Sequence, residues 1–340
     1  MRTGNILQYS HTVGFYAMSG KGFYNPVDVA IRDDGLMYVL NRAGPEVAGR
    51  LPYKRISMCT LDEEFLGDFG SGGSGDGQLM WPASITLDTH SNVYVSDEAL
   101  HRISVFDRDG IFQGKWGSYG INEGQFDKPA GMTMDQEGNL LIVDGGNCRV
   151  QRYTKEGRFL DQWGTYGNEP GQFNYPWGIT TDLDWNIYVA DWRNDRIQKF
   201  TSAGDYVSSF GSSGSGNGQL NRPAGVAVDD TGSIYIADWG NERLQILDHK
   251  GDFQAALRGE SGISKWGQDY FLSNMDELEE RHKADLEPHI ESSEPDYLRY
   301  QSGSVEKLFW GPTSIVIDHN NNIYVVDSCR FRIQVFQRNV

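Results

Sequence analysis

The sequence predicts an all-β protein, a six-bladed β-propeller with four strands in each blade. Three observations support this. An apolar residue followed after two variable positions by proline and a β-branched run occurs six times. The steps between these prolines are 56, 47, 47, 47 and 89 residues, so one unit of 47 residues recurs. The 41 glycines indicate many turns. The six prolines are Pro26, Pro82, Pro129, Pro176, Pro223 and Pro312.

One unit divides into four short strands separated by turn residues. The expected strands are Gly178–Asp182, Asn186–Asp191, Arg196–Phe200 and Tyr206–Gly211. Alternating apolar and polar residues with polar turns between them are typical of antiparallel strands. Four such strands form one propeller blade.

The two ends of the chain are expected to complete the last blade together. Arg332–Phe336 is a third strand, and no fourth strand follows it. Gln8–Gly14 has the position, relative to the first anchor proline, that an outer strand has in the other units. The sequence therefore predicts a single domain over residues 1–340 whose N-terminal strand closes the ring.

The two longer steps predict insertions into the repeat. One adds 9 residues within 42–54, in the loop between the second and third strands of the first unit. The other adds 42 residues at about 260–301, between the fifth and sixth units, and is acidic. Ser273 followed by Asp276 resembles a helix start, and Pro288 would end that helix.

An aspartate and an arginine recur at a fixed distance in five of the six units. The arginine comes five residues after the aspartate that ends the second strand, in Asp97, Asp144, Asp191, Asp238 and Asp327 with Arg102, Arg149, Arg196, Arg243 and Arg332. The first unit has Asn41 and Arg55, separated by its insertion. Because the pair recurs in five units, we expect it to hold loops rather than to act in catalysis.

These motifs resemble the NHL repeat family. The resemblance rests on Asp191-Trp-Arg-Asn-Asp-Arg-Ile-Gln-Lys-Phe200 and Asp238-Trp-Gly-Asn-Glu-Arg-Leu-Gln-Ile-Leu247, and it extends over nearly all of the chain outside the long insertion. It implies the propeller fold. It does not fix the activity, because that family includes enzymes, RNA-binding proteins and protein scaffolds.

Both insertions are expected on one face of the disc, because successive strands run antiparallel and their connections alternate between faces. Positions on that face that vary between units are rich in aromatic and basic residues, which suit stacking and forked hydrogen bonds. This predicts a site for a protein, a peptide or a small molecule. The alternative is that each tryptophan simply packs between blades. The predicted ligand-binding residues are Arg42, Trp81, Tyr175, Trp192, Arg222 and Trp239.

The rival prediction is a lyase or hydrolase at the channel mouth, with the 260–301 segment as its lid. Asp28, Glu98 and His101 would then be the acid/base groups or the ligands of a divalent cation. Asp28 is the one carboxylate in the ring of residues two positions after the anchor prolines, where several oxygen ligands would have to converge.

The charge and hydropathy of the chain exclude some function classes. The net charge of −17 disfavours binding to nucleic acid backbones or to anionic membranes. No run of 18 apolar residues is present, so we expect no membrane insertion. The first residues lack an apolar secretory segment, and three cysteines do not form a disulfide framework. A cytoplasmic location is therefore expected.

Overall fold

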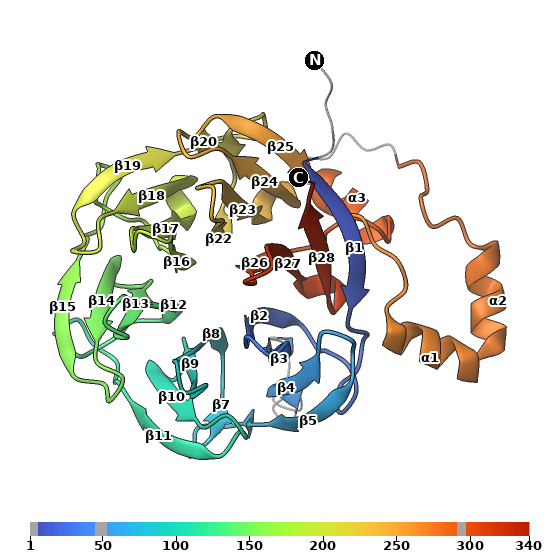
Figure 1. The fold of residues 1–340 in the computed structure, drawn as a ribbon, viewed down its shortest axis with the longest axis horizontal. Helices are drawn as coiled ribbons and strands as arrows, with labels where there is room; N and C mark the ends of the chain where they lie inside the picture. The colour runs from blue at the N-terminus through green and yellow to red at the C-terminus, as the bar shows by residue number, and fades with distance from the viewer. Residues whose placement is uncertain (1–5, 45–52, 291–296, 340) are drawn as a thin grey trace.

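The computed structural model describes residues 6–44, 53–290 and 297–339. Six four-stranded antiparallel sheets are arranged around a central axis, as Figure 1 shows. Blade 1 contains β2 (Pro26–Ile31), β3 (Leu36–Asn41), β4 (Arg55–Thr60) and β5 (Phe65–Phe69). Blade 2 contains β8 (Pro82–Leu87), β9 (Val93–Asp97), β10 (Arg102–Phe106) and β11 (Phe112–Trp116). Blade 3 contains β12 (Pro129–Met134), β13 (Leu140–Asp144), β14 (Arg149–Tyr153) and β15 (Phe159–Trp163).

The second half of the ring repeats this order. Blade 4 contains β16 (Ile179–Thr181), β17 (Ile187–Asp191), β18 (Arg196–Phe200) and β19 (Tyr206–Phe210). Blade 5 contains β22 (Pro223–Val228), β23 (Ile234–Asp238), β24 (Arg243–Leu247) and β25 (Phe253–Leu257). Blade 6 contains β26 (Pro312–Ile317), β27 (Asn322–Asp327), β28 (Arg332–Arg338) and β1 (Leu7–Val13). Two-residue strands form parallel pairs between some blades, namely β6 (Ser71–Gly72) with β7 (Gln78–Leu79) and β20 (Ser212–Ser213) with β21 (Gln219–Leu220).

The N-terminal strand closes the ring, which confirms the expectation from the sequence. β1 pairs antiparallel with β28, with Leu7 opposite Arg338 and Val13 opposite Ile333. Both ends of the chain therefore belong to blade 6, and each blade has the four strands predicted.

The recurring aspartate and arginine fix the loops between blades. In blade 3, Arg149 Nε donates to Asp144 at 2.8 Å, and its Nη atoms donate to the carbonyl oxygens of Ile121, Asn122 and Gln125. Blades 4 and 5 repeat these bonds. The arginine guanidinium binds carbonyl oxygens of the loop, and the aspartate holds that guanidinium in place, which explains why both residue types recur.

A glycine and an aromatic residue fill the outer end of the interface between consecutive blades. The turn before an outer strand has a glycine with positive φ, and an added Cβ there would lie 2.4–2.8 Å from an aromatic ring that ends the preceding outer strand. Only glycine combines this backbone with the close approach of the ring. The pairs are Gly110 with Phe69, Gly157 with Trp116, Gly204 with Trp163, and Gly251 with Phe210.

The interface between blades 6 and 1 lacks this pair. The repeat places Val13 at the aromatic position and Glu63 at the glycine position. Trp266, from the long insertion, is buried here at 2% exposure and contacts Phe23 and Phe65 edge-on. Its indole N–H donates to the Glu63 carbonyl oxygen. The insertion thus supplies the aromatic residue that the closure of the ring lacks.

In its described residues, the insertion contains three helices rather than the single one predicted. They are α1 (Lys265–Ser273), α2 (Met275–Lys283) and α3 (Tyr297–Ser304). Ser273 ends α1 instead of capping a helix, so that prediction is wrong. The cap is Ser264, whose hydroxyl accepts from Gly267 N–H at 3.1 Å. The Glu63 carboxylate accepts from the backbone N–H groups of Lys265 and Trp266.

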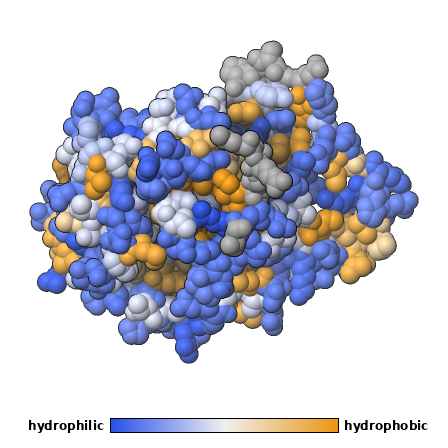
Figure 2. All heavy atoms as spheres, turned by 45° about the horizontal axis from the view of Figure 1, so that its top comes forward, coloured by the Kyte–Doolittle hydropathy of each residue, from blue (hydrophilic) through white to orange (hydrophobic). Residues whose placement is uncertain are grey.

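The first two helices project from the rim of the disc beside β1 and do not cover the channel, as Figure 1 shows. The prediction of a lid formed by this part of the insertion is therefore wrong, because burial of Trp266 holds α1 at the outer edge of blades 6 and 1. Figure 2 shows a largely hydrophilic surface, with hydrophobic atoms exposed on these projecting helices. Leu272 and Met275 are 71% and 60% exposed.

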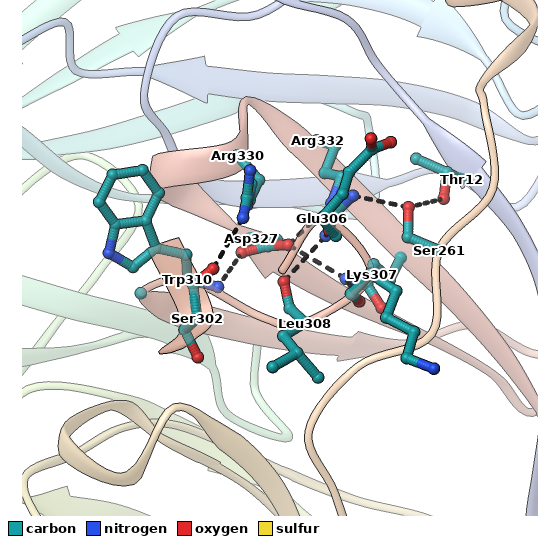
Figure 3. Close-up of polar contacts among 12 residues, drawn as sticks. Thr12, Ser261, Ser302, Glu306, Lys307, Leu308, Trp310, Asp327, Arg330 and Arg332 are labelled. Carbon is teal, nitrogen blue, oxygen red and sulfur yellow. Dashed lines mark hydrogen bonds and ion pairs between the residues drawn. The ribbon is translucent and has the colours of Figure 1, made fainter. Parts of the chain in front are cut away.

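Blade 6 binds both ends of the insertion, as Figure 3 shows. Arg332 donates to the Ser261 hydroxyl at its start and to the Glu306 and Leu308 carbonyl oxygens after its end. Arg330 binds the carbonyl oxygens of the last turn of α3 and of the residue that follows it, as a C-terminal cap. The start and the end of the insertion are therefore fixed to one blade. None of the helices in the described ranges is long and apolar enough to span a membrane.

Candidate functional site

The connection that leads into the first strand of a blade and the connection that follows its second strand meet where the channel opens. In blades 1, 2, 3 and 6, the residue after the second strand donates its N–H to the carbonyl oxygen of the residue before the anchor proline. Examples are Arg42 to Asn25 at 3.0 Å and Glu98 to Trp81 at 3.0 Å. In blades 4 and 5 the bond joins the neighbouring residues, Arg193 to Asn174 and Gly240 to Asn221. The positions that vary between repeats are thus paired side by side around the mouth.

Five aromatic side chains lie at the mouth and touch one another or share a cation. Tyr175 stacks on Trp177 with centroids 6.4 Å apart, and it lies 6.0 Å from Trp192. Trp192 in turn lies 6.2 Å from Trp239 of the next blade. Arg42 links Trp177 to Trp81, because its guanidinium lies 5.5 Å from the centre of the first ring and 4.9 Å from that of the second.

Within the described ranges, six cations lie over these rings. Beside Arg42, Lys54 lies 5.0 Å from Trp81 and Lys128 lies 5.5 Å from Tyr175. Contacts of 5–6 Å between a cation and a ring centroid are favourable. We name the whole arrangement the mouth ring, whose aromatic members are Trp81, Tyr175, Trp177, Trp192 and Trp239 and whose cations are Arg42, Lys54, Lys128, Arg193, Arg222 and Arg299.

The structure brings together all six residues that the sequence predicts as ligand-binding. Five further members were missed. One of them, Lys128, precedes an anchor proline as Trp81, Tyr175 and Arg222 do. Trp177 could have been found, because the other units have alanine, valine or threonine directly after the proline. Arg193, Lys54 and Arg299 follow no repeat pattern, and the last of these comes from the insertion.

A buried ion pair lies at the blade 1 side of the mouth ring. Arg42 Nη2 and Glu98 Oε2 are 3.4 Å apart, and both side chains are largely buried. Burial raises the pKa of Glu98, while the positive charge of Arg42 opposes the shift. Burial also lowers the pKa of Lys54 to about 8, and the charge of Arg42 adds to this. Lys54 Nζ donates to the Arg42 carbonyl oxygen at 2.7 Å.

Asp28 joins blade 1 to both of its neighbours. Its carboxylate accepts from the Ser84 hydroxyl at 2.7 Å and Ile85 N–H at 2.9 Å in blade 2, and from the Ser314 hydroxyl at 2.6 Å in blade 6. Its own neighbour Val29 donates the fourth bond. Burial raises the pKa of Asp28, and these bonds oppose the rise. Because both oxygens are fully engaged, we assign Asp28 a structural role.

His101 likewise links two blades. Its Nδ1 accepts from the Lys128 backbone N–H at 3.2 Å, and its ring packs 4.8 Å from Tyr119. Asp195 and Glu242 make the same bond in later blades, to Arg222 N–H and Gly311 N–H. The position thus serves the connection between blades. Within residues 6–44, 53–290 and 297–339, no group of three His, Cys, Asp or Glu side chains could hold a metal ion.

Comparisons with known proteins agree with the repeat. The NHL repeat model matches residues 126–153, 173–200, 220–247 and 309–336. The chain contains NHL repeats and folds as a six-bladed NHL propeller. No curated protein sequence matches it.

Solved structures similar to this NHL propeller include a catalytically inactive variant of virginiamycin B lyase from Staphylococcus aureus bound to quinupristin. It is 15% identical, with 98% of this chain and 99% of that chain covered and a TM-score of 0.57. A Bacteroides thetaiotaomicron protein of unknown function is 17% identical, with coverage of 96% and 72% and a TM-score of 0.60. A chain of the nidogen/laminin complex is 18% identical, with coverage of 68% and 79% and a TM-score of 0.50. At these identities the likeness shows the fold alone.

The channel of the NHL propeller is a cavity of about 350 Å³ lined by the six inner strands. Small residues occur where neighbouring inner strands meet, because a Cβ on Gly131 would lie 2.4 Å from the Trp177 carbonyl oxygen and one on Gly178 2.5 Å from that of Ala224. The ring that the sequence suggests as a place for metal ligands is thus a contact between blades. The accessible chemistry lies at the mouth ring above it.

Proposed function

We propose that this NHL propeller is a recognition module that binds a segment of a partner protein across the mouth ring. The observation that carries the proposal is the continuous set of aromatic contacts from Tyr175 to Trp192 and Trp239, which spans two blades and is flanked by cations. Half-buried tryptophan, tyrosine and arginine are the residue types that dominate binding energy at protein interfaces.

The placement of Trp192 and Trp239 supports recognition over simple packing, whereas Trp177 packs against a core cluster. Trp116 and Trp163 pack against hydrophobic clusters between blades. Trp192 and Trp239 belong to no hydrophobic core cluster of the described residues and keep part of their rings exposed. A ring that stabilises no core and is held in place by a cation is pre-organised for a ligand.

The alternative function, a lyase or hydrolase, depends on a set of acid/base groups. Asp28 and His101 form bonds between blades, and Glu98 is paired with Arg42. Each of the three groups is thus engaged in a structural contact of its own, and we propose the recognition role.

The test compares the intact protein with a face variant, Trp192→Ala combined with Trp239→Ala. Each protein is used to capture partners from the cells that make it, and captured partners are then purified and their affinity measured. We expect at least about a tenfold loss of affinity, because truncated aromatic hot spots cost about 2 kcal/mol or more. Tyr206→Ala, at a ring that is 38% exposed on an outer strand, is the matched control. Equal affinity of all three proteins would refute the proposal.

A further inference from the structure

We infer that the segment bound at the mouth ring is an acidic peptide that also carries apolar side chains; this rests on the proposed function and specifies its ligand. The argument starts from three members of the mouth ring, Lys128, Arg193 and Arg222, which we call the cationic patch. All three are exposed. They surround Tyr175 and Trp192, with Arg193 at 5.1 Å from the first ring and Arg222 at 5.1 Å from the second.

The cationic patch differs from the other cations of the mouth ring in its charge balance. Arg42 pairs with Glu98 at 3.4 Å, and Arg299 pairs with Glu242 at 2.5 Å. In the described part of the chain, no member of the cationic patch forms an ion pair. Acidic groups lie nearby, since the Asp195 carboxylate accepts from the Arg222 backbone N–H at 2.7 Å, but the three charged side-chain groups of the patch remain without an ion pair among the described residues. On a protein with a net charge of −17, three such neighbouring cations favour an anionic ligand at this place.

Stacking fixes how these arginines can bind. A guanidinium held over a ring keeps the N–H donors at its edge available, and this fork matches the two oxygens of a carboxylate. Because Arg193 and Arg222 both lie over Trp192, at 5.7 and 5.1 Å, two such forks occur on one surface. Aspartate or glutamate side chains of a partner would meet both.

Apolar residues extend the same face outward from the cationic patch. In the connection between β11 and β12, Tyr119 is 68% exposed and Ile121 is 77% exposed. Tyr119 packs on His101, which binds the Lys128 backbone, so this connection adjoins the patch. Tyr166, in the next connection, is 74% exposed. A ligand that covers both the cations and these side chains must be longer than one residue, which favours a peptide segment over a small molecule.

The test is a selection from short random peptides displayed on phage against the immobilised full chain. Peptides that bind the support without the protein are removed, and the affinity of the remaining peptides is measured for the intact chain and for the double variant Arg193→Ala/Arg222→Ala. The inference predicts peptides that combine aspartate or glutamate with aromatic or aliphatic residues. Their affinity should fall at least about tenfold in the double variant, since charge-assisted bonds are lost.

A matched control removes two arginines from the opposite face. Arg108→Ala/Arg158→Ala takes the same charge from exposed turns between third and fourth strands and should leave binding unchanged. The inference is overturned if the selected peptides are neutral or basic, or if no peptide is selected while a random RNA pool binds through the patch. Either result leaves the proposed function standing as long as Trp192→Ala/Trp239→Ala still weakens partner binding at least about tenfold, so the two failures are distinguishable.

Discussion

Arg299 places its guanidinium 5.1 Å from the centre of the Trp239 ring, the same distance at which Arg222 lies over Trp192. Arg222 precedes the anchor proline of blade 5, whereas blade 6 has Gly311 at that position. A Cβ on Gly311 would lie 3.6 Å from Trp239 Nε1. The insertion therefore supplies from α3 the cation that the repeat lacks, and the mouth ring continues into blade 6.

This relationship predicts the effect of Arg299→Ala. The substitution leaves the Glu242 carboxylate buried at 1% exposure without its cation. We expect a loss of about 1–3 kcal/mol in the free energy of unfolding, reduced by the partial exposure of Arg299. Urea denaturation measures it. In the double variant Arg299→Ala/Glu242→Gln, much of this loss in stability should be recovered. A loss in the double variant that equals or exceeds the sum of the two single losses would contradict the pairing.

The ring closure predicts a larger effect for Trp266→Ala. Because Trp266 fills the place of a missing aromatic residue between blades 6 and 1, its removal leaves a cavity at the point where the chain ends meet. We expect a loss of about 3–5 kcal/mol in stability and faster proteolysis of the N-terminal strand. Leu272→Ala, at an exposed residue of the same helix, serves as the control and should change stability by less than about 0.5 kcal/mol. Similar values for both variants would contradict the role of Trp266.

Lys54 predicts a dependence of stability on pH. Its pKa in the folded protein is about 8, below the ordinary value of 10.5, so the unfolded chain binds more protons between these two values. The contribution of Lys54 to the free energy of unfolding therefore rises as the pH increases through that range. Below pH 8 the cost of burying the charged ammonium group is fully present. The unfolding free energy of the protein minus that of Lys54→Met should increase by about 1–2 kcal/mol from pH 7 to 9.5. A constant difference would show that Lys54 has an ordinary pKa.

Contacts between inner strands predict that the channel tolerates no added side chain at Gly131. A methyl group there would lie 2.4 Å from the Trp177 carbonyl oxygen, which is backbone and cannot turn away. Gly131→Ala should destabilise the protein by about 1–3 kcal/mol in thermal or urea unfolding. Gly114→Ala provides the comparison, because a Cβ added there would have nothing within 4 Å and no positive φ is required. Equal stability of the two variants would contradict the close approach of blades 3 and 4.

The propeller could be predicted from the sequence because its determinants are local and repeated. Each Pro176-like anchor, and each pair such as Asp191 and Arg196, marks one blade, and the position of Gln8–Gly14 relative to Pro26 predicts the closure. The six predicted ligand-binding residues also meet, because they occupy the same two loop positions of the repeat, one after the second strand and one before the anchor proline. The repeat period alone was sufficient for these predictions.

The insertion could not be predicted in this way, because no second copy of it exists for comparison. The capping pattern at Ser273 was outweighed by Ser264, whose helix is fixed by tertiary contacts with Glu63. The roles of Asp28 and His101 were also hidden, since their hydrogen bonds reach other blades rather than nearby residues. The role of a residue that binds a different blade cannot be predicted from the repeat pattern of the sequence.

The most direct test of the mouth ring as a recognition surface is the dissociation constant of a captured partner, measured by titration calorimetry. The measurement compares the intact protein with Trp192→Ala/Arg222→Ala, and Tyr206→Ala again serves as the control. Recognition through the mouth ring predicts affinity at least about tenfold weaker for the double variant alone, with all three proteins folded. Equal affinities would show that the partner binds elsewhere and would contradict the central claim.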